Sequence, residues 1–328
     1  MKVQYLRILS VICIMAAILS FSACQKTPEN EQSDNTVYHT VNFNTNGGSA
    51  IPSMQIESGK VATRPDDPVL DNYVFCRWEY NDLPWIFSET RVKQDITLNA
   101  IWVSADVLFG IEPVEGGLSL KGLNRQESFE WLNVPSMING KTVVAVSDGA
   151  FEAVHENYSK HIIFPETLKG IGNGSFQDIS ATDLTFKGAI TTLGESSFES
   201  CTTLKEITLG KGLTEIPFRS FYECTALKHI DVPDGTLVIR EDAFGGCTSL
   251  VTIVLPATLT SIEDGAFDDC TAIKTVFYKG TEEQFDKLDI SSLNDAIIDA
   301  KVYFYSEQEP TESGDFWHYN NNGSPTIW

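Results

Sequence analysis

Four regularly spaced cysteines are the residues of this sequence whose type and spacing most clearly suggest chemistry. They recur every 23 residues, at Cys201, Cys224, Cys247 and Cys270. Zinc binding would require a tetrahedral set of ligands, whereas a repeat places its cysteines in a row. Disulfides are also disfavoured, because parallel stacked side chains suit the torsion of an S–S bond poorly. Val154 and Ile179 hold the equivalent positions of two earlier repeats, so we expect the cysteines to act as small buried hydrophobic residues.

The other reactive residues form no catalytic or metal-binding motif. The five histidines lack the HExxH spacing of zinc enzymes, and the sequence contains neither a serine nucleophile motif nor an acidic calcium loop. Gly170–Gly174 is rich in glycine but lacks the strand, helix and downstream acid of a nucleotide-binding loop, and Lys211 between two glycines does not complete a phosphate-binding loop. We therefore expect no catalytic residue, no metal ion and no cofactor.

Phenylalanines recur with the cysteines and define a repeat of about 23 residues. They stand at Phe151, Phe176, Phe198, Phe221, Phe244 and Phe267. Each later repeat continues into a pair of apolar residues two positions apart, as in Ile207 and Leu209, which predicts a short strand with both side chains on one side. One unit cannot bury its apolar face alone, whereas stacked units form a parallel sheet with a continuous core. We expect seven or eight strands spaced by about 4.8 Å.

The segment Ile262–Cys270 shows the repeat in its fullest form and resembles the BspA-like leucine-rich repeat, whose consensus begins I-x-x-x-A-F-x-x-C. The resemblance implies a solenoid of parallel strands with short helices and turns over residues 104–305, caps included. We expect an entry strand at Trp131–Pro135, a terminal helix at Thr281–Leu288 opened by a capping box, and the last strand at Lys301–Tyr305. Thr236 breaks the leucine column unless Leu237 replaces it.

Residues 37–103 follow a different pattern, with strands expected at Thr40–Gly48, Asn72–Trp78 and Thr97–Trp102. They resemble the internalin-type B-repeat, also called the Listeria–Bacteroides repeat, at Val41, Phe43, Asn46, Gly47, Gly48, Tyr73, Phe75, Trp78, Asp95, Thr97, Leu98, Ala100 and Trp102. The resemblance implies a small β-rich, β-grasp-like domain that serves as a spacer or adhesive module. Asn72 and Cys76 stand where the family usually has glycine. Asparagine tolerates positive φ, and we expect the Cys76 side chain to pack against other residues rather than to react.

The first residues have the pattern of a secretory signal, with Lys2 and Arg7 before an apolar run that is shorter than a membrane-spanning helix. Phe21–Cys24 resembles a bacterial lipobox, which implies that residues 1–23 are removed and that Cys24 carries the lipid; the alternative is ordinary cleavage after Ala23. Acyl chains would then anchor the protein through a flexible tether at residues 24–36. The expected location is the exposed surface of the bacterial cell envelope.

The strongly negative net charge of the chain limits the classes of molecule that it can bind. Residues 1–23 contain no acidic residue, so removing them would change the formal charge from −22 to −24. Such a protein is repelled by nucleic acid and by anionic membrane surfaces. We therefore expect no nucleic-acid partner, and contact with the membrane only through the lipid anchor.

The residues that flank each inward-facing strand residue should form two outward-facing columns. One column is Trp131, His161, Asp183, Glu206, His229, Thr252 and Thr275. The other is Asn133, Ile163, Thr185, Thr208, Asp231, Val254 and Phe277. Apolar residues in the second column favour a ligand-binding surface, although they could also be solitary or covered by a cap. The aromatic tail at residues 306–328 could bind a sugar or close the end of the solenoid.

The leading hypothesis is a non-catalytic, adhesin-like surface lipoprotein that binds an extracellular protein or glycan, from host matrix or another bacterial surface. The alternative is a structural scaffold of the envelope without an external ligand. An enzyme is the least favoured class.

Overall fold

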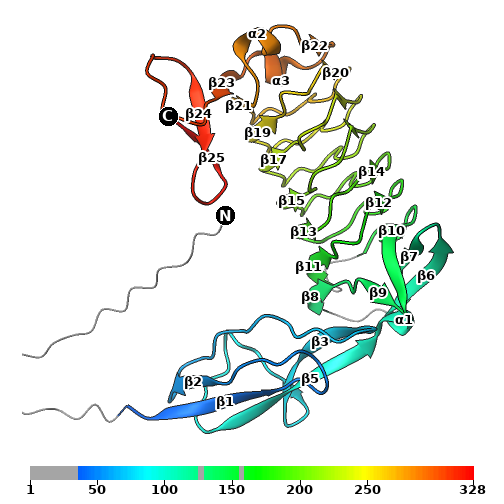
Figure 1. Ribbon diagram of the computed structural model, residues 1–328, viewed down its shortest axis with the longest axis vertical. Helices are drawn as coiled ribbons and strands as arrows, with labels where there is room; N and C mark the ends of the chain where they lie inside the picture. Colours follow the sequence, from blue (N-terminus) through cyan, green and yellow to red (C-terminus); the bar gives the residue numbers. More distant parts are fainter. Residues whose placement is uncertain (1–35, 125–128, 155–158) are drawn as a thin grey trace, which may run out of the picture. The chain divides into compact units, whose positions relative to one another are not determined.

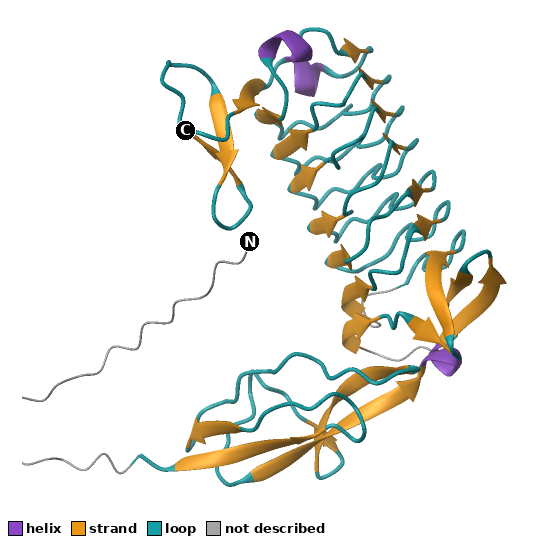
Figure 2. Ribbon diagram, in the orientation of Figure 1, coloured by secondary structure: helices purple, strands orange, loops and turns teal. Residues whose placement is uncertain are grey.

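The computed structural model describes residues 36–124, 129–154 and 159–328. The expected signal segment, Cys24 and nearly all of the tether lie outside these residues. Tyr38–Trp328 forms one compact unit. Most of it is strand and turn, and the repeats follow one another along a solenoid (Figures 1 and 2).

The β-rich module is a five-stranded sheet in the order β2-β1-β5-β3-β4. Its strands are β1 Tyr38–Asn44, β2 Met54–Glu57, β3 Tyr73–Tyr80, β4 Leu83–Pro84 and β5 Ile96–Ser104. The three expected strands correspond to β1, β3 and β5, whereas β2 and β4 were not anticipated. Val41, Trp78 and Leu98 are buried in the module's own hydrophobic core.

The two departures from the B-repeat pattern lie at special backbone positions. Asn72 has φ of 65°, as its replacement of a glycine predicts. Cys76 lies where the pairing of β3 with β5 shifts register between Phe75 and Arg77. An extra residue in one strand forms a bulge, and the half-buried Cys76 side chain packs against the solenoid core.

The solenoid begins with a cap built from α1 Ala105–Leu108, β6 Phe109–Val114, β7 Gly117–Leu123, β9 Met137–Ile138 and β10 Lys141–Val146. β6 and β7 form an antiparallel hairpin, and β10 pairs parallel with β7. A second set of short parallel strands continues from this cap, comprising β12 Gly170–Ile171, β14 Thr192–Leu193, β16 Glu215–Ile216, β18 Val238–Ile239, β20 Ser261–Ile262 and β22 Asp289–Ile290.

The main column contains eight strands among the described residues, as the repeat predicts. They are β8 Phe129–Asn133, β11 Ser159–Phe164, β13 Asp183–Phe186, β15 Glu206–Thr208, β17 His229–Asp231, β19 Thr252–Leu255, β21 Thr275–Tyr278 and β23 Lys301–Tyr305. Pairing between neighbours is parallel and offset by one repeat, so that Leu184 lies beside Ile207. The sheet is interrupted between β15 and β17, where the Lys228 amide and the Lys205 carbonyl are 3.5 Å apart.

The phenylalanines form one continuous buried stack, as expected. Adjacent rings from Phe151 to Phe267 lie 5.1–5.4 Å apart between centroids and within 12° of parallel. A backbone ladder runs alongside, in which each phenylalanine amide donates to the next repeat, as Phe198 does to the Ser220 carbonyl over 2.8 Å. The cysteine thiols lie in the same core, and each donates to a phenylalanine carbonyl, as Cys224 does to that of Phe198 over 3.1 Å.

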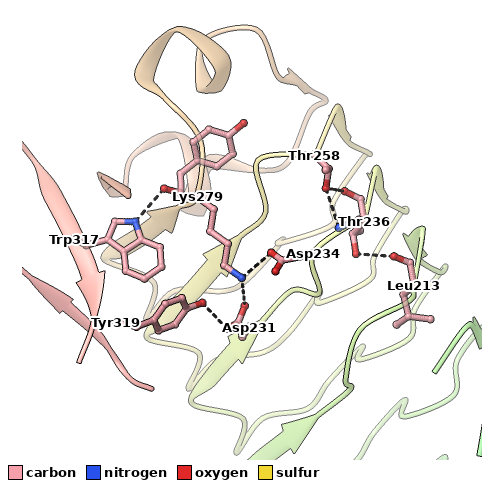
Figure 3. Close-up of polar contacts among 10 residues, drawn as sticks. Leu213, Asp231, Asp234, Thr236, Thr258, Lys279, Trp317 and Tyr319 are labelled. Atoms are coloured by element: carbon pink, nitrogen blue, oxygen red, sulfur yellow. Dashed lines mark hydrogen bonds and ion pairs between the residues drawn. The ribbon is translucent and has the colours of Figure 1, made fainter. Parts of the chain in front are cut away.

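The leucine column accommodates Thr236 without help from Leu237. Thr236 is fully buried and its hydroxyl donates to the Leu213 carbonyl over 3.3 Å, whereas Leu237 is 45% exposed (Figure 3). The hydrogen bond satisfies the buried hydroxyl, which explains why the column tolerates a polar residue. The interpretation in which Leu237 fills the position is therefore wrong.

The C-terminal end differs from expectation in two respects. α2 Glu282–Phe285 is shorter than the expected helix, but Thr281 and Gln284 form the predicted capping box. α3 Asp295–Ile298 follows, and then β23. β23 is not the last strand, because β24 Phe316–Tyr319 pairs with it and with β25 Pro325–Ile327.

A single side chain terminates the backbone ladder. No further repeat follows Phe267, and its amide instead donates to the Asn294 side-chain oxygen over 3.0 Å. The Asn294 nitrogen donates to the carbonyls of Glu263, Ser291 and Ser292, and the residue is fully buried. Asn294 therefore replaces the missing turn.

We predict that Asn294→Ala lowers the free energy of unfolding by about 2–4 kcal/mol, because it leaves the buried Phe267 amide without an acceptor and removes the side chain that ties it to the Glu263, Ser291 and Ser292 carbonyls. Denaturant unfolding would measure the change. Asn322→Ala, in an exposed turn, is the control and should stay within about 0.5 kcal/mol of the parent. Equal stability of the two variants would contradict the capping role.

Candidate ligand-binding face

The two predicted columns do lie in register along the main strands. His161 pairs with Trp131 and Asp183, and Thr185 with Ile163 and Thr208. The same register continues from β17 through β19 to β21. The columns therefore form one surface, here called the strand face. Whether it binds a ligand stays a prediction.

The first five strands leave this surface open to solvent. We call this part the open strand face, and its side chains, all half-buried or exposed, are Trp131, Asn133, His161, Ile163, Asp183, Thr185, Glu206, Thr208 and His229. Asp231 on β17 is half-buried and is bound by Tyr319 and Lys279. The Trp131 and His161 rings stack, with centroids 4.1 Å apart, and the His161 Nδ1 atom is hydrogen-bonded to Asp183. Burial lowers the pKa of His229, against the opposing charge of Asp231, so His229 is neutral at pH 7. The surface thus combines aromatic rings with carboxylates.

The last two predicted apolar residues are not exposed, which corrects the expectation for Val254 and Phe277. They are 0% and 7% exposed. The fully buried Trp317 of β24 packs on them in a separate hydrophobic cluster, together with Tyr303 and Tyr319. The neighbouring Thr252 and Thr275 remain half-buried.

Polar contacts hold β24, here called the covering segment, against the solenoid (Figure 3). The Trp317 Nε1 donates to the Tyr278 carbonyl over 3.0 Å, and the Tyr319 hydroxyl donates to Asp231 over 2.8 Å. Lys279 pairs with Asp231 and Asp234 over 3.2 and 2.9 Å. Burial lowers the pKa of Lys279, but the bond to Asp234 and the charge of Asp231 outweigh it, and the net shift is upward.

The aromatic tail therefore resolves into two parts. Trp317 and Tyr319 cover the strand face rather than the end of the solenoid, whereas His318 stacks on the exposed Trp328 with ring centroids 3.8 Å apart. Burial, followed by the bond to Asp231, raises the pKa of Tyr319 to about 12. The hydroxyl accordingly remains a donor at neutral pH.

A cleft of about 820 Å³ adjoins the open strand face. Trp131, Asn133 and Ile163 line it, together with Asp66, Asp67 and Asp71, which our reading of the sequence missed. The Asn133 side-chain nitrogen donates to Asp67 over 2.9 Å. The volume falls within the range of small-ligand sites. The concentration of charged residues in Arg64–Asp71 could have suggested a binding site, but the sequence alone does not show that this segment lies next to β8.

The periodic cysteines do not form a reactive site. All four are buried and in the reduced state. Burial raises the pKa of the Cys224 and Cys247 thiols, which keeps them protonated and unreactive. Within the described residues there is no cluster of three metal-ligating side chains, and no helix long and apolar enough to span a membrane.

Comparison with known families gives two matches. The model of the BspA type leucine rich repeat region matches residues 125–240 and 214–303, which together make up more than half of the chain. The Listeria-Bacteroides repeat domain matches residues 39–101. A curated protein from Evansella cellulosilytica, provisionally named a membrane protein, is 33% identical over 67 residues, which are 20% of this chain and only 10% of that protein.

Solved leucine-rich repeat proteins are similar over parts of the chain. A leucine rich cell surface protein from Faecalibacterium prausnitzii is 26% identical, with a TM-score of 0.39, over 54% of this chain and 39% of that one. A leucine-rich repeat protein from Eubacterium ventriosum is 20% identical, with a TM-score of 0.47, over 65% and 54% of the two chains. This chain thus spans about half or less of either structure.

We predict that Trp317→Ala detaches the covering segment and exposes Val254 and Phe277. Replacing a buried tryptophan by alanine typically lowers the free energy of unfolding by about 3–5 kcal/mol. If only the tail is released while the repeats stay folded, the loss appears as local unfolding of the tail instead. Binding of a hydrophobic dye should rise, and tail amides should lose protection from hydrogen exchange. Tyr319→Phe should have a smaller effect, and Val251→Ala, an exposed residue, none. Unchanged dye binding and exchange in the Trp317 variant would contradict the covering role.

Proposed function

Because the chain belongs to the BspA-type leucine-rich repeat family, we propose that it is a bacterial surface protein that binds an extracellular protein through the open strand face and catalyses no reaction. Repeat proteins of this kind generally act as protein-binding scaffolds. The observation that carries the proposal is the alignment of aromatic, apolar and acidic side chains across four strands in register. A rigid solenoid presents such a surface at little entropic cost on binding.

The open part of the strand face suits a protein ligand better than a purely apolar partner. Asp183 and Glu206 place carboxylates in the same row of side chains as Trp131 and His161. Aromatic side chains are enriched at the centres of protein interfaces, and polar groups surround them at the rim. A glycan ligand, or an envelope scaffold without a ligand, is a possible outcome of the test below.

We predict that arginines at the centre of the open strand face block binding. The double variant Thr185→Arg and Thr208→Arg should lower the affinity for a captured matrix protein at least about tenfold by steric and charge disruption. The matched control is Thr202→Arg with Thr248→Arg, two exposed turn residues.

An array of fibronectin, fibrinogen, laminin and collagen beside neutral glycans and peptidoglycan would provide the measurement. Retention of a matrix protein that only the Thr185 and Thr208 variant loses supports the proposal. Retention of none, together with an envelope defect on gene deletion, would favour the scaffold instead.

We also propose that Cys24 carries the lipid anchor, based on the lipobox-like Phe21–Cys24. Cells fed a clickable fatty acid should label the protein, and Cys24→Ala should abolish the label and release the protein from the membrane fraction. Cys13→Ala, within the expected signal segment, is the matched control and should keep both. Labelling that survives Cys24→Ala would overturn the assignment.

A further inference from the structure

Several aromatic residues line the cleft beside the open strand face, and Trp131 is the one that also belongs to that face. Trp131 lies on β8, the outermost strand of its four-stranded sheet, and His161 on β11 stacks against one face of its ring. Side chains in register stack along the solenoid, so the other ring face points away from β11. No further strand follows β8 on that side, and Trp131 also lines the cleft. A planar group entering the cleft can therefore continue the stack.

The charges around the cleft favour a cation. Four carboxylates line it, from Asp66, Asp67, Asp71 and Glu166, against two cations, Arg64 and Lys187. Arg64 is already paired with Asp67, whose side chain is only 8% exposed and also accepts from Asn133. Asp66 and Asp71 are exposed, and neither has an ion-pair partner among the residues that the structure describes. The surplus is negative, in keeping with the charge of the whole chain.

One protein side chain meets both requirements. The guanidinium group of arginine is planar, stacks on indole rings and pairs with carboxylates through its forked N–H groups. Lysine pairs as a point charge but cannot stack as a plane, and a neutral sugar ring can stack but gains nothing from the surplus carboxylates.

We propose that the cleft is a subsite for an arginine side chain of the protein ligand, stacked on Trp131 and paired with Asp66 and Asp71. The proposal rests on the proposed function and names the chemistry by which one end of the open strand face recognises its partner. The volume of about 820 Å³ leaves room for residues on either side of the arginine.

The test uses small probes of the whole folded protein. N-acetyl-arginine amide is titrated against its neutral isostere N-acetyl-citrulline amide, N-acetyl-lysine amide and methyl β-glucoside, with indole N–H shifts as the readout. The arginine probe should bind at least about threefold more tightly than either amino-acid analogue and should weaken as salt is added. Tighter binding of the glucoside, or equal binding of citrulline, would replace the arginine subsite by a sugar or an uncharged site.

Variants then locate the binding. Trp131→Ala should weaken the arginine probe by about 3- to 30-fold, and Asp66→Asn with Asp71→Asn by about 2- to 10-fold. The controls Trp328→Ala and Asp269→Asn remove an exposed aromatic ring and an exposed carboxylate elsewhere, and they should leave binding unchanged. Because Asp66 and Asp71 are exposed, their variants should fold normally even if Trp131→Ala does not.

Failure of the inference can be distinguished from failure of the proposed function. Arginine binding that survives all cleft variants would mean general attraction to an acidic surface and would overturn the inference. A matrix ligand lost on changing Thr185 and Thr208 but not Trp131, Asp66 and Asp71 would uphold the proposed function and again overturn the subsite.

Discussion

Stacking of the phenylalanine column, together with the amide ladder beside it, is the constraint from which the other features of the solenoid follow. Each ring lies against two others at about van der Waals contact, and each amide finds its acceptor only in the next repeat. A repeat therefore has almost no stability of its own and depends on its neighbours. The two ends are where this arrangement must be closed, by the β6–β7 hairpin at one end and Asn294 at the other.

The same register determines what the surface can present. Strands offset by one repeat bring residues 22 to 30 positions apart side by side, so that Trp131, His161 and Asp183 form a continuous row. A surface fixed in this way loses little conformational entropy when it binds. The four periodic thiols lie in the interior, where they pack in the core and do not reach this surface.

Local patterns predicted the repeat, the two columns, the capping box and the buried cysteines, because each depends on residues within one repeat or at a fixed offset from it. They failed where a distant segment decides the environment. Val254 and Phe277 were expected to be exposed, and their burial depends on Trp317, 63 and 40 positions further along the chain. Asp66 and Asp71 line the cleft but belong to the β-rich module, and the spacing of the solenoid repeat cannot predict where residues of that module lie. Thr236 shows a different limit of sequence patterns, because a hydrogen bond to the Leu213 carbonyl lets a polar residue fill an apolar position.

The covered and open parts of the strand face differ in the way their polar groups are satisfied. Over β19 and β21 Trp317 packs on the apolar residues Val254 and Phe277, and on the adjoining β17 Tyr319 and Lys279 bind Asp231. Toward β8 the aromatic ring of Trp131 and the carboxylates Asp66 and Asp71 have no such cover within the described chain. A large apolar patch left open would be an aggregation risk, whereas a charged aromatic surface stays hydrated until a complementary partner arrives. This division of the face agrees with the proposal that a ligand binds at the N-terminal end of the solenoid.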